Sequence, residues 1–238
     1  MKIMTYDDYN ALSCEVAKKA ASYIKKGGLM CFAAGDTPMG MLRELIKMQK
    51  RGEVNLSAAH YISLDEWIGL GPDDEGSCIK IMNENFYRPA GIPPEQIWLF
   101  DGLNPDTDKQ CREAEKIIES HSGISFALLG IGMNGHIGFN EPGTPETPGC
   151  FTVDLDDTTK SVSEKYFGKA LPVTRGITIG WKELLNSKSA VLMASGIEKA
   201  AIIKAAVKGT VSMDVPASFF QKHRDITVML DTNAASML

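Results

Sequence analysis

The middle of the chain reads Phe126-Ala-Leu-Leu-Gly130-Ile-Gly132-Met-Asn134-Gly135-His136-Ile-Gly138-Phe-Asn140-Glu141-Pro142-Gly143, an apolar run followed by a glycine-rich polar loop. The run 126–129 is short, apolar and bounded by glycine, which predicts a buried strand in a sheet that is covered on both faces. Open α/β sheets place their sites at the carboxyl ends of their strands. The loop that begins at Gly130 is therefore the first candidate for a functional site.

This loop contains a single histidine, His136, together with the carboxylate Glu141 and the amide Asn134. A histidine can exchange a proton near neutral pH, and a nearby carboxylate can orient its ring and stabilise its charged form. A lone histidine in a loop is also common as a surface or hydrogen-bonded structural residue. The glycine density and the polar neighbours favour a catalytic role for His136.

The same loop matches the dinucleotide-binding fingerprint Gly-x-Gly-x-x-Gly at Gly130, Gly132 and Gly135. That fingerprint requires a helix to open at its third glycine. Here Pro142 and further glycines follow closely, so a long helix is not expected to start there. We therefore expect no nicotinamide cofactor.

The rest of the chain alternates between strand and helix patterns without an internal repeat or a clean linker. Strands are predicted at residues 29–34, 60–64, 97–100, 126–129, 173–180, 190–194 and 225–230. Helices are predicted at residues 7–26, 39–49, 79–87, 105–120 and 196–207. Such alternation predicts an α/β fold with a doubly wound, mostly parallel sheet and helices on both faces, a Rossmann-like three-layer sandwich. The length of 238 residues is expected to form a single domain, residues 1–238.

The first predicted strand is followed by the turn Gly35-Asp36-Thr37-Pro38 and then by a helix. Thr37 is expected to be the N-cap of this helix and Pro38 its first residue. Free backbone N–H groups and the helix dipole make such a turn a natural site for an anion. The alternative is a plain connection with a good cap. An anion at this turn also requires the carboxylate of Asp36 to point away.

Two further positions carry candidate chemistry. Asp65 and Glu66 follow the strand predicted at 60–64, and neighbouring side chains on an extended chain face opposite ways. One of them can point into a crevice while the other faces outward or caps another element, although a solvated acidic loop is the simpler reading. Lys199 lies near the start of a predicted helix, where its charge opposes the helix dipole, and such local conflicts tend to mark functional positions.

Composition excludes several classes of function. The net charge of −5 and the lack of any Lys/Arg block argue against a nucleic-acid partner. No apolar run approaches the ~20 residues needed to span a bilayer, so we expect no membrane association. The cysteines are odd in number and form no CxxC pair, which predicts reduced thiols in a cytoplasmic protein and no zinc site. They are Cys14, Cys31, Cys78, Cys111 and Cys150.

Four motifs in a fixed order give the chain a specific resemblance. It resembles the glucosamine-6-phosphate deaminase (isomerase) family, which shares its fold with 6-phosphogluconolactonases. The motifs are Gly35-x-Thr37-Pro38, Leu64-Asp65-Glu66-Trp67-Ile-Gly69-Leu70, Gly135-His136-Ile-x-Phe-Asn140-Glu141-Pro142 and Gly196-x-x-Lys199.

Within the family, two segments look closer to galactosamine-6-phosphate isomerases of amino-sugar catabolism, namely residues 171–180 and 215–219. Asn134 points the same way, because glucosamine-6-phosphate deaminases usually carry Asp at this position. The pair Asn140-Glu141 argues against the lactonase branch, which usually lacks it.

The resemblance implies a role for each candidate residue at the reacting end of a sugar. Asp65 would move a proton between C2 and C1 of the open-chain amino sugar. His136 would open the pyranose ring by protonating the ring oxygen, and Glu141 would hold and polarise His136. Because Asn134 brings no charge, we expect His136 to rely on Glu141 alone for electrostatic support.

The resemblance also implies how the 6-phosphate is held. Gly35, Asp36 and Thr37 form the phosphate turn, and Lys199 supplies a cation. Arg175 is expected to assist, with Lys165 as a competing candidate for the same contact.

The implied activity is aldose–ketose isomerisation with deamination of an amino-hexose 6-phosphate, which hydrolyses a C–N bond and requires no metal and no redox cofactor. Galactosamine 6-phosphate is favoured, giving tagatose 6-phosphate and ammonia, with glucosamine 6-phosphate, giving fructose 6-phosphate, next. A 6-phosphogluconolactonase and a non-catalytic sugar-phosphate sensor are the alternatives. The expected partner is a small-molecule sugar phosphate, and the sequence leaves a homo-oligomer open.

Overall fold

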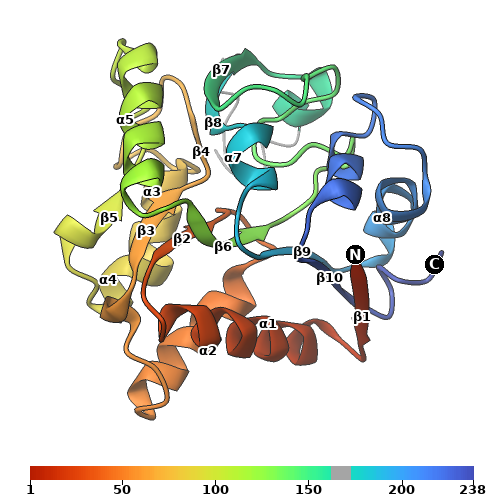
Figure 1. Cartoon of the computed structure of the whole chain (residues 1–238), viewed down its shortest axis with the longest axis horizontal. Coiled ribbons are helices and arrows are strands. Elements are labelled where there is room, and N and C mark those ends of the chain that lie inside the picture. The colour runs from red at the N-terminus through yellow and green to blue at the C-terminus, as the bar shows by residue number, and fades with distance from the viewer. Residues whose placement is uncertain (162–172) are drawn as a thin grey trace.

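A computed structural model describes residues 1–161 and 173–238 of the chain. Its centre is a seven-stranded sheet in the order β1-β10-β9-β6-β2-β3-β5, in which each neighbouring pair is parallel (Figure 1). The strands are β1 (Lys2–Tyr6), β2 (Leu29–Phe32), β3 (His60–Ser63), β5 (Ile97–Trp98), β6 (Ile124–Leu129), β9 (Ala190–Ala194) and β10 (Ile226–Asp231). The predicted α/β class with a mostly parallel sheet is confirmed.

Helical segments cover both faces of this sheet (Figure 1). One face carries α1 (Tyr9–Ile24), α2 (Met39–Lys50), the π-helical turn η2 (Asn83–Tyr87) and α4 (Arg88–Ala90), and α3 (Cys78–Met82) packs on the small strand β4 and leads into η2. The other carries α5 (Thr107–Ser120), α7 (Trp181–Leu185), α8 (Ala200–Lys208) and the 3₁₀ helix η5 (Pro216–Lys222). Shorter 3₁₀ turns are η1 (Leu56–Ala58), η3 (Pro94–Gln96) and η4 (Ile197–Lys199). None of the helices in the described ranges is long and apolar enough to cross a membrane.

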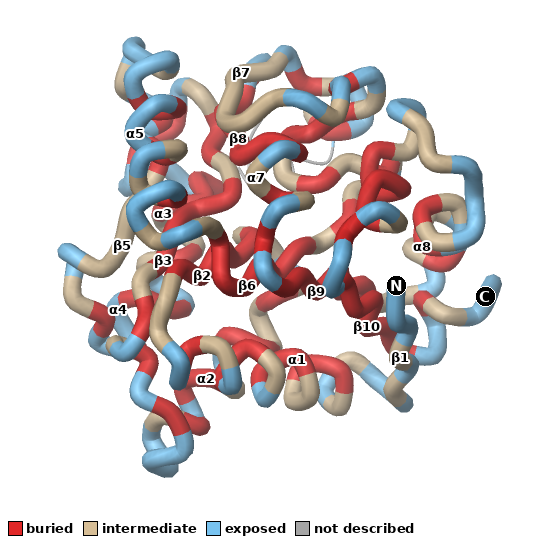
Figure 2. Tube along the Cα trace, in the orientation of Figure 1, coloured by how far each residue is buried: buried red, intermediate tan, exposed pale blue. Residues whose placement is uncertain are grey.

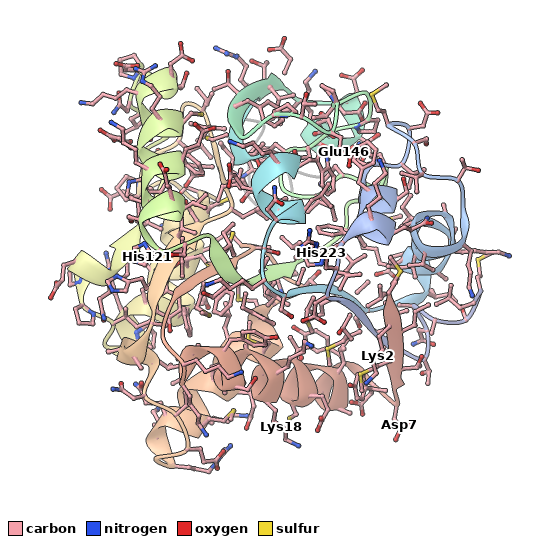
Figure 3. The ribbon with its side chains drawn as sticks, viewed as in Figure 1. Lys2, Asp7, Lys18, His121, Glu146 and His223 are labelled. Atoms are coloured by element: carbon pink, nitrogen blue, oxygen red, sulfur yellow. The ribbon has the colours of Figure 1, made fainter. Side chains whose placement is uncertain are left out.

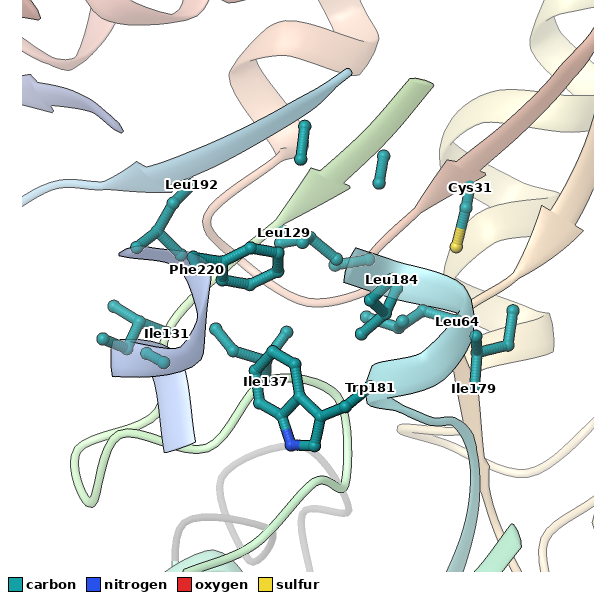
Figure 4. Packing of buried hydrophobic residues seen from close by; sticks show 14 of the residues in the cluster. Cys31, Leu64, Leu129, Ile131, Ile137, Ile179, Trp181, Leu184, Leu192 and Phe220 are labelled. Carbon is teal, nitrogen blue, oxygen red and sulfur yellow. The ribbon is translucent and has the colours of Figure 1, made fainter. Parts of the chain in front are cut away.

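The core lies in two layers, one on each face of the sheet. All six residues of β6 are buried, as its continuous apolar run predicts, and the central strands are buried along their length (Figure 2). Phe126 and Leu128 belong to the layer under α1 and α2, whereas Ala127 and Leu129 belong to the opposite layer. Figure 4 shows Trp181 and Phe220 packed in this second layer. Both faces of the sheet are therefore closed to water.

A second, smaller sheet lies over the α5–α7 face and was not predicted. It contains β4 (Asp65–Trp67), β8 (Arg175–Ile179) and β7 (Cys150–Asp154), paired antiparallel in the order β4-β8-β7. The prediction that residues 173–180 form a strand is correct, but its assignment to the parallel sheet is wrong. The N–H of Ile179 donates to the carbonyl of Leu64 at 2.8 Å, so β8 pairs with the chain just after it leaves β3.

The order of the strands creates a crevice at the centre of the parallel sheet. From β2 the chain proceeds outward through β3 to β5, and then returns to place β6 on the other side of β2. The connections that follow β2 and β6 therefore diverge to opposite sides. This reversal is the topological switch point at which open α/β sheets bind ligands.

The loop after β6 is fixed to the small sheet by the amide of Asn140. This side chain is fully buried, and its Nδ2 donates to the carbonyls of Ile137 at 2.8 Å and Ile179 at 2.9 Å. Residues 137 and 140 also form an isolated antiparallel bridge. This amide, together with the bond from the N–H of Phe139 to Thr178 Oγ1 at 3.2 Å, attaches the glycine-rich loop to β8.

We expect Asn140→Asp to destabilise the chain by about 3 kcal/mol, because the carboxylate cannot donate to either carbonyl and would be buried beside them. Urea unfolding at pH 7 measures this change. Asn186→Asp is the matched control, since the exposed Asn186 donates to the carbonyl of Lys182 at the end of α7. Its expected effect stays within about 0.5 kcal/mol. Equal effects of the two substitutions would contradict the role assigned to Asn140.

Candidate active site

A cavity of about 180 Å³ lies at the carboxyl ends of β2, β3 and β6, at the switch point of the sheet. Its walls come from the turn after β2, the start of β4, the loop after β6 and the end of η4. The structure therefore brings together residues that lie up to 164 positions apart in the sequence, from Gly35 to Lys199. The predicted residues that line the cavity are Gly35, Asp36, Thr37, Asp65, His136 and Lys199.

Besides the exposed Asp36, the acidic residue that lines this cavity is Asp65. Burial raises its pKa to about 6, while the thiol of Cys78, 3.6 Å from Oδ1, and the charge of His136 act in the opposite direction. At pH 7 Asp65 is therefore mainly ionised, and it is a stronger base than an ordinary aspartate. Cys78, like the other four cysteines, is free.

The neighbouring Glu66 points the other way, as the strand geometry predicts. Its carboxylate is fully buried and accepts the backbone N–H groups of Trp67 at 2.8 Å, Cys78 at 3.0 Å and Ile79 at 2.8 Å. These bonds join β4 to the start of α3. Glu66 thus fixes the strand that presents Asp65.

His136 faces Asp65 from the loop after β6, and its Nδ1 has two side-chain neighbours. Glu141 Oε2 lies 3.4 Å away and Thr159 Oγ1 lies 3.1 Å away. Burial alone would raise the pKa of Glu141, but the hydrogen bonds from His136, Thr159 and Asn134 outweigh it and hold that pKa below its ordinary value. Glu141 is therefore a carboxylate, and Nε2 of His136 is the ring nitrogen left for a bound molecule.

Glycines allow the two reactive groups to approach the backbone. A Cβ on Gly132 would lie 2.3 Å from Cε1 of His136, so the imidazole packs directly against this residue. Gly138 has a φ of +57°, and a Cβ there would lie 3.3 Å from Oδ2 of Asp65. No helix begins between residues 130 and 149, which confirms that the glycine fingerprint does not open one.

Asn134 lies behind His136 and links it to a carboxylate that the sequence did not reveal. Its Nδ2 donates to Glu141 Oε2 at 3.0 Å and to Asp156 Oδ1 at 3.2 Å, while its Oδ1 accepts the backbone N–H of His136 at 3.2 Å. The expectation that Glu141 alone supports His136 stays a prediction, but a second carboxylate, Asp156, is hydrogen-bonded to the same amide. Asp156 and Thr159 come from a polar segment with no motif of its own, so no sequence signal identified them.

The turn after β2 has the expected position but a different cap. The N-cap of α2 is Pro38, whose neighbour Thr37 makes no capping bond, so the predicted N-cap is wrong by one residue. The hydroxyl of Tyr9 accepts the N–H of Gly40 at 2.8 Å and lies 3.0 Å from the carbonyl of Thr37, to which it donates. Tyr9 replaces the missing cap, a role that only the packing of α1 beside α2 could show.

Lys199 reaches the cavity from the turn after β9. It ends the 3₁₀ turn η4 and immediately precedes α8, and its Nζ donates to the carbonyl of Ile131 at 2.7 Å. The buried carboxylate of Asp231 accepts the N–H of Gly196 at 3.1 Å and fixes this turn. The lysine is thus held beside the loop that carries His136.

Arg175 does not line the cavity. It is the first residue of β8, where the antiparallel register places it opposite Asp154. Its Nε lies 3.6 Å from Oδ1 of Asp154, and its Nη2 donates to Thr152 Oγ1 at 3.0 Å. The competing candidate, Lys165, lies outside the described residues.

Of the four histidines, all within the described ranges, only His136 lines the cavity. His121 is at the end of α5 (Figure 3). Its ring centroid lies 4.8 Å from that of His60. His223 is buried, with Nε2 3.0 Å from the hydroxyl of Ser187. These three histidines are explained by packing.

The chain is similar to known proteins over its whole length. The family model described as glucosamine-6-phosphate isomerases/6-phosphogluconolactonase matches residues 8–229. A glucosamine-6-phosphate deaminase of Thermoanaerobacter sp. (strain X514) is 38% identical over 245 residues, covering 100% of this chain and 95% of the relative. The corresponding protein of Bacillus pumilus is 35% identical over 240 residues, covering 100% of both chains.

Solved structures give the same result. A monomeric glucosamine-6-phosphate deaminase superimposes with a TM-score of 0.96 at 34% identity and 100% coverage of both chains. A 6-phosphogluconolactonase from Trypanosoma brucei superimposes with a TM-score of 0.80 at 17% identity, covering 100% of this chain and 98% of its own. At that identity the second likeness shows a shared fold and nothing more.

The raised pKa of Asp65 predicts a cost in stability. A carboxyl group whose pKa is higher in the folded chain than in the unfolded chain stabilises the fold at pH values below its unfolded pKa. This contribution is lost as the pH rises from about 4 through about 6. Asp65→Asn should therefore be more stable than the wild type above pH 7, by on the order of 1–3 kcal/mol, with the difference shrinking toward pH 4.5.

Urea unfolding across this pH range measures the effect. Asp73→Asn, in the exposed loop before α3, is the control and should follow the wild type at every pH. A stability difference between Asp65→Asn and the wild type that does not change with pH would show that burial does not perturb this carboxyl.

Proposed function

The chain belongs to the glucosamine-6-phosphate isomerase/6-phosphogluconolactonase family, and from this premise we propose that it converts an amino-hexose 6-phosphate, with glucosamine 6-phosphate as the first candidate, into a ketohexose 6-phosphate and ammonia. One observation carries the proposal. Asp65 and His136 face a single cavity that also contains the Gly35–Thr37 turn and Lys199.

The phosphate end of the substrate would bind at the turn after β2. The turn Gly35–Thr37 lines the cavity just before α2 begins, and Lys199 adds a positive charge across the cavity. Binding energy at this non-reacting end orients C1 and C2 toward Asp65 and His136.

The reaction needs only proton transfers and one water. His136 protonates the ring oxygen, and the pyranose opens to the aldehyde. Asp65 removes the proton from C2 and returns it to C1, while O1 gains a proton and the amine loses one, which leaves a hydroxyl at C1 and an imine at C2. Water adds to this C2 carbon and ammonia departs, so the products are a ketose and ammonia. Each proton transfer of this kind typically contributes 10²–10⁴-fold to the rate.

The net reaction consumes water and breaks the C2–N bond, and we propose hydrolysis of a C–N bond on this basis. We also propose that the chain acts as one domain, because β4 of the small sheet and the carboxyl ends of the large sheet supply groups to the same cavity. A cytoplasmic location and a homo-oligomer stay predictions, and one relative of known structure is described as monomeric.

The expected preference for galactosamine 6-phosphate finds no support among the relatives. Those named above are glucosamine-6-phosphate deaminases. Asn134, on which part of the expectation rested, contacts Glu141 and Asp156 and does not line the cavity. Galactosamine 6-phosphate is therefore the epimer with which glucosamine 6-phosphate is compared in the test below.

Ammonia release by the purified protein tests the proposal. Glucosamine 6-phosphate, galactosamine 6-phosphate and 6-phosphogluconolactone are supplied in parallel, with Asp65→Asn as the catalytic control. We expect ammonia from the first substrate in preference to the second, and a loss of at least about 100-fold in Asp65→Asn. Hydrolysis of the lactone alone would establish a lactonase, and binding of the amino sugar without ammonia would establish a sensor.

The packing of His136 against Gly132 gives a second test. A Cβ in Gly132→Ala would collide with the imidazole, so we expect kcat to fall at least about tenfold. In Gly130→Ala, two residues earlier, the new Cβ would lie 3.8 Å from Thr37, an ordinary contact, and the loss should be clearly smaller. Equal losses would mean that these glycines serve the loop backbone and not the imidazole.

A further inference from the structure

The carboxylate of Asp156 is connected to His136 although it lies 20 positions away in the sequence. Its Oδ1 accepts the N–H of Thr158 at 2.8 Å and the Nδ2 of Asn134 at 3.2 Å. The same Nδ2 donates to Glu141 Oε2 at 3.0 Å. One amide group therefore lies between two carboxylates.

The orientation of this amide is determined by its neighbours. The Oδ1 of Asn134 accepts the backbone N–H of His136, and this N–H is a donor that cannot accept a hydrogen bond from an N–H₂ group turned toward it. A flipped amide would also place its oxygen against the two carboxylates. The two N–H bonds of Asn134 must therefore be directed at Glu141 and Asp156.

We propose that Asp156 is a positioning residue for His136, acting through the amide of Asn134 so that the imidazole has a second negative charge beside it. This inference rests on the function proposed above. Glu141 contacts the ring directly. Asp156 accepts a hydrogen bond from the amide of Asn134, and the same amide is hydrogen-bonded to Glu141 and to the backbone N–H of His136.

The charged groups around His136 show what the carboxylate of Asp156 contributes to the imidazole. The charged groups near the ring are Glu141 at 3.4 Å, Asp156 behind the amide, Asp65 across the cavity and, with the opposite sign, Lys199 in the same cavity. The hydrogen bonds from Thr158 chiefly hold the pKa of Asp156 below its ordinary value, so it is ionised at neutral pH. Its charge favours the protonated imidazole, which is the form that opens the sugar ring.

Asn134 and Asp156 form a matched pair. An aspartate at position 134 would place a third carboxylate about 3 Å from Glu141 and Asp156, and such groups cannot all ionise at neutral pH. An asparagine at position 156 would keep a hydrogen-bond acceptor but remove the charge. Exchanging both residues keeps two carboxylates and one amide, so the two substitutions should compensate each other.

A double-mutant cycle tests the pair by ammonia release, with kcat, KM and their pH dependence measured for each variant. We expect Asp156→Asn to lower kcat about 3- to 10-fold with little change in KM. The alkaline limb of its pH profile should move down by about half a pH unit, because removal of the negative charge favours loss of the imidazole proton. Asn134→Asp should lower kcat more than about tenfold.

The double variant Asn134→Asp/Asp156→Asn should be at least about tenfold more active than the product of the two single effects. Asp157→Asn is the matched control, because Asp157 is the adjacent carboxylate, has a 98% exposed side chain and pairs with Lys160. It should leave kcat within about twofold and the pH profile unchanged. Additive effects in the cycle, or equal behaviour of Asp156→Asn and Asp157→Asn, would overturn the inference.

A measurement without turnover separates this inference from the proposed function. The ¹⁵N resonances of the His136 imidazole, identified by their absence in His136→Asn, are titrated in the wild type, Asp156→Asn and Asp157→Asn. A lower titration midpoint in Asp156→Asn alone supports the inference, whether or not the protein releases ammonia. Absence of ammonia release would refute only the proposed function. Identical midpoints in the three proteins would refute the inference. This comparison does not use Asn134→Asp, so it tests the inference even if that variant fails to fold.

Discussion

The amide of Asn140 joins the two halves of the active site. Its hydrogen bonds attach the loop that carries His136 to β8, and β8 is paired with β4, which begins at Asp65. His136, the proposed acid, and Asp65, the proposed base, are therefore connected through the loop after β6, β8 and β4. The parallel sheet supplies the crevice, but this attachment fixes the distance between the groups that face it.

The site holds two carboxylates in opposite electrostatic states. Burial beside few donors raises the pKa of Asp65 to about 6, which suits a base that must hold and release a proton. Glu141 is also buried, but its hydrogen bonds hold its pKa below the ordinary value, which suits a group that remains charged beside an imidazole. Environments that shift the pKa values of two carboxyl groups in opposite directions suit these groups to different tasks.

The fold alone does not identify the reaction. The lactonase of Trypanosoma brucei has the same architecture at 17% identity, so the sheet and its switch point are compatible with more than one chemistry. The arrangement around His136 is more specific, because Glu141, Asn134 and Asp156 form one hydrogen-bonded group behind the ring. The function proposed here rests on Asp65 and His136 facing one cavity, and not on the fold.

The sequence by itself determined the central strands, the switch-point loop and the candidates Asp65, His136 and Lys199, because apolar runs, glycines and isolated polar residues act over short stretches of chain. It did not determine the small sheet, the contact of Arg175 with Asp154, the replacement of the Thr37 cap by Tyr9, or the approach of Asp156 to Asn134. Each of these depends on pairing or packing between segments distant in the sequence. A residue such as Asp156 has no distinguishing neighbours along the chain, and only the tertiary structure places its charge behind the imidazole.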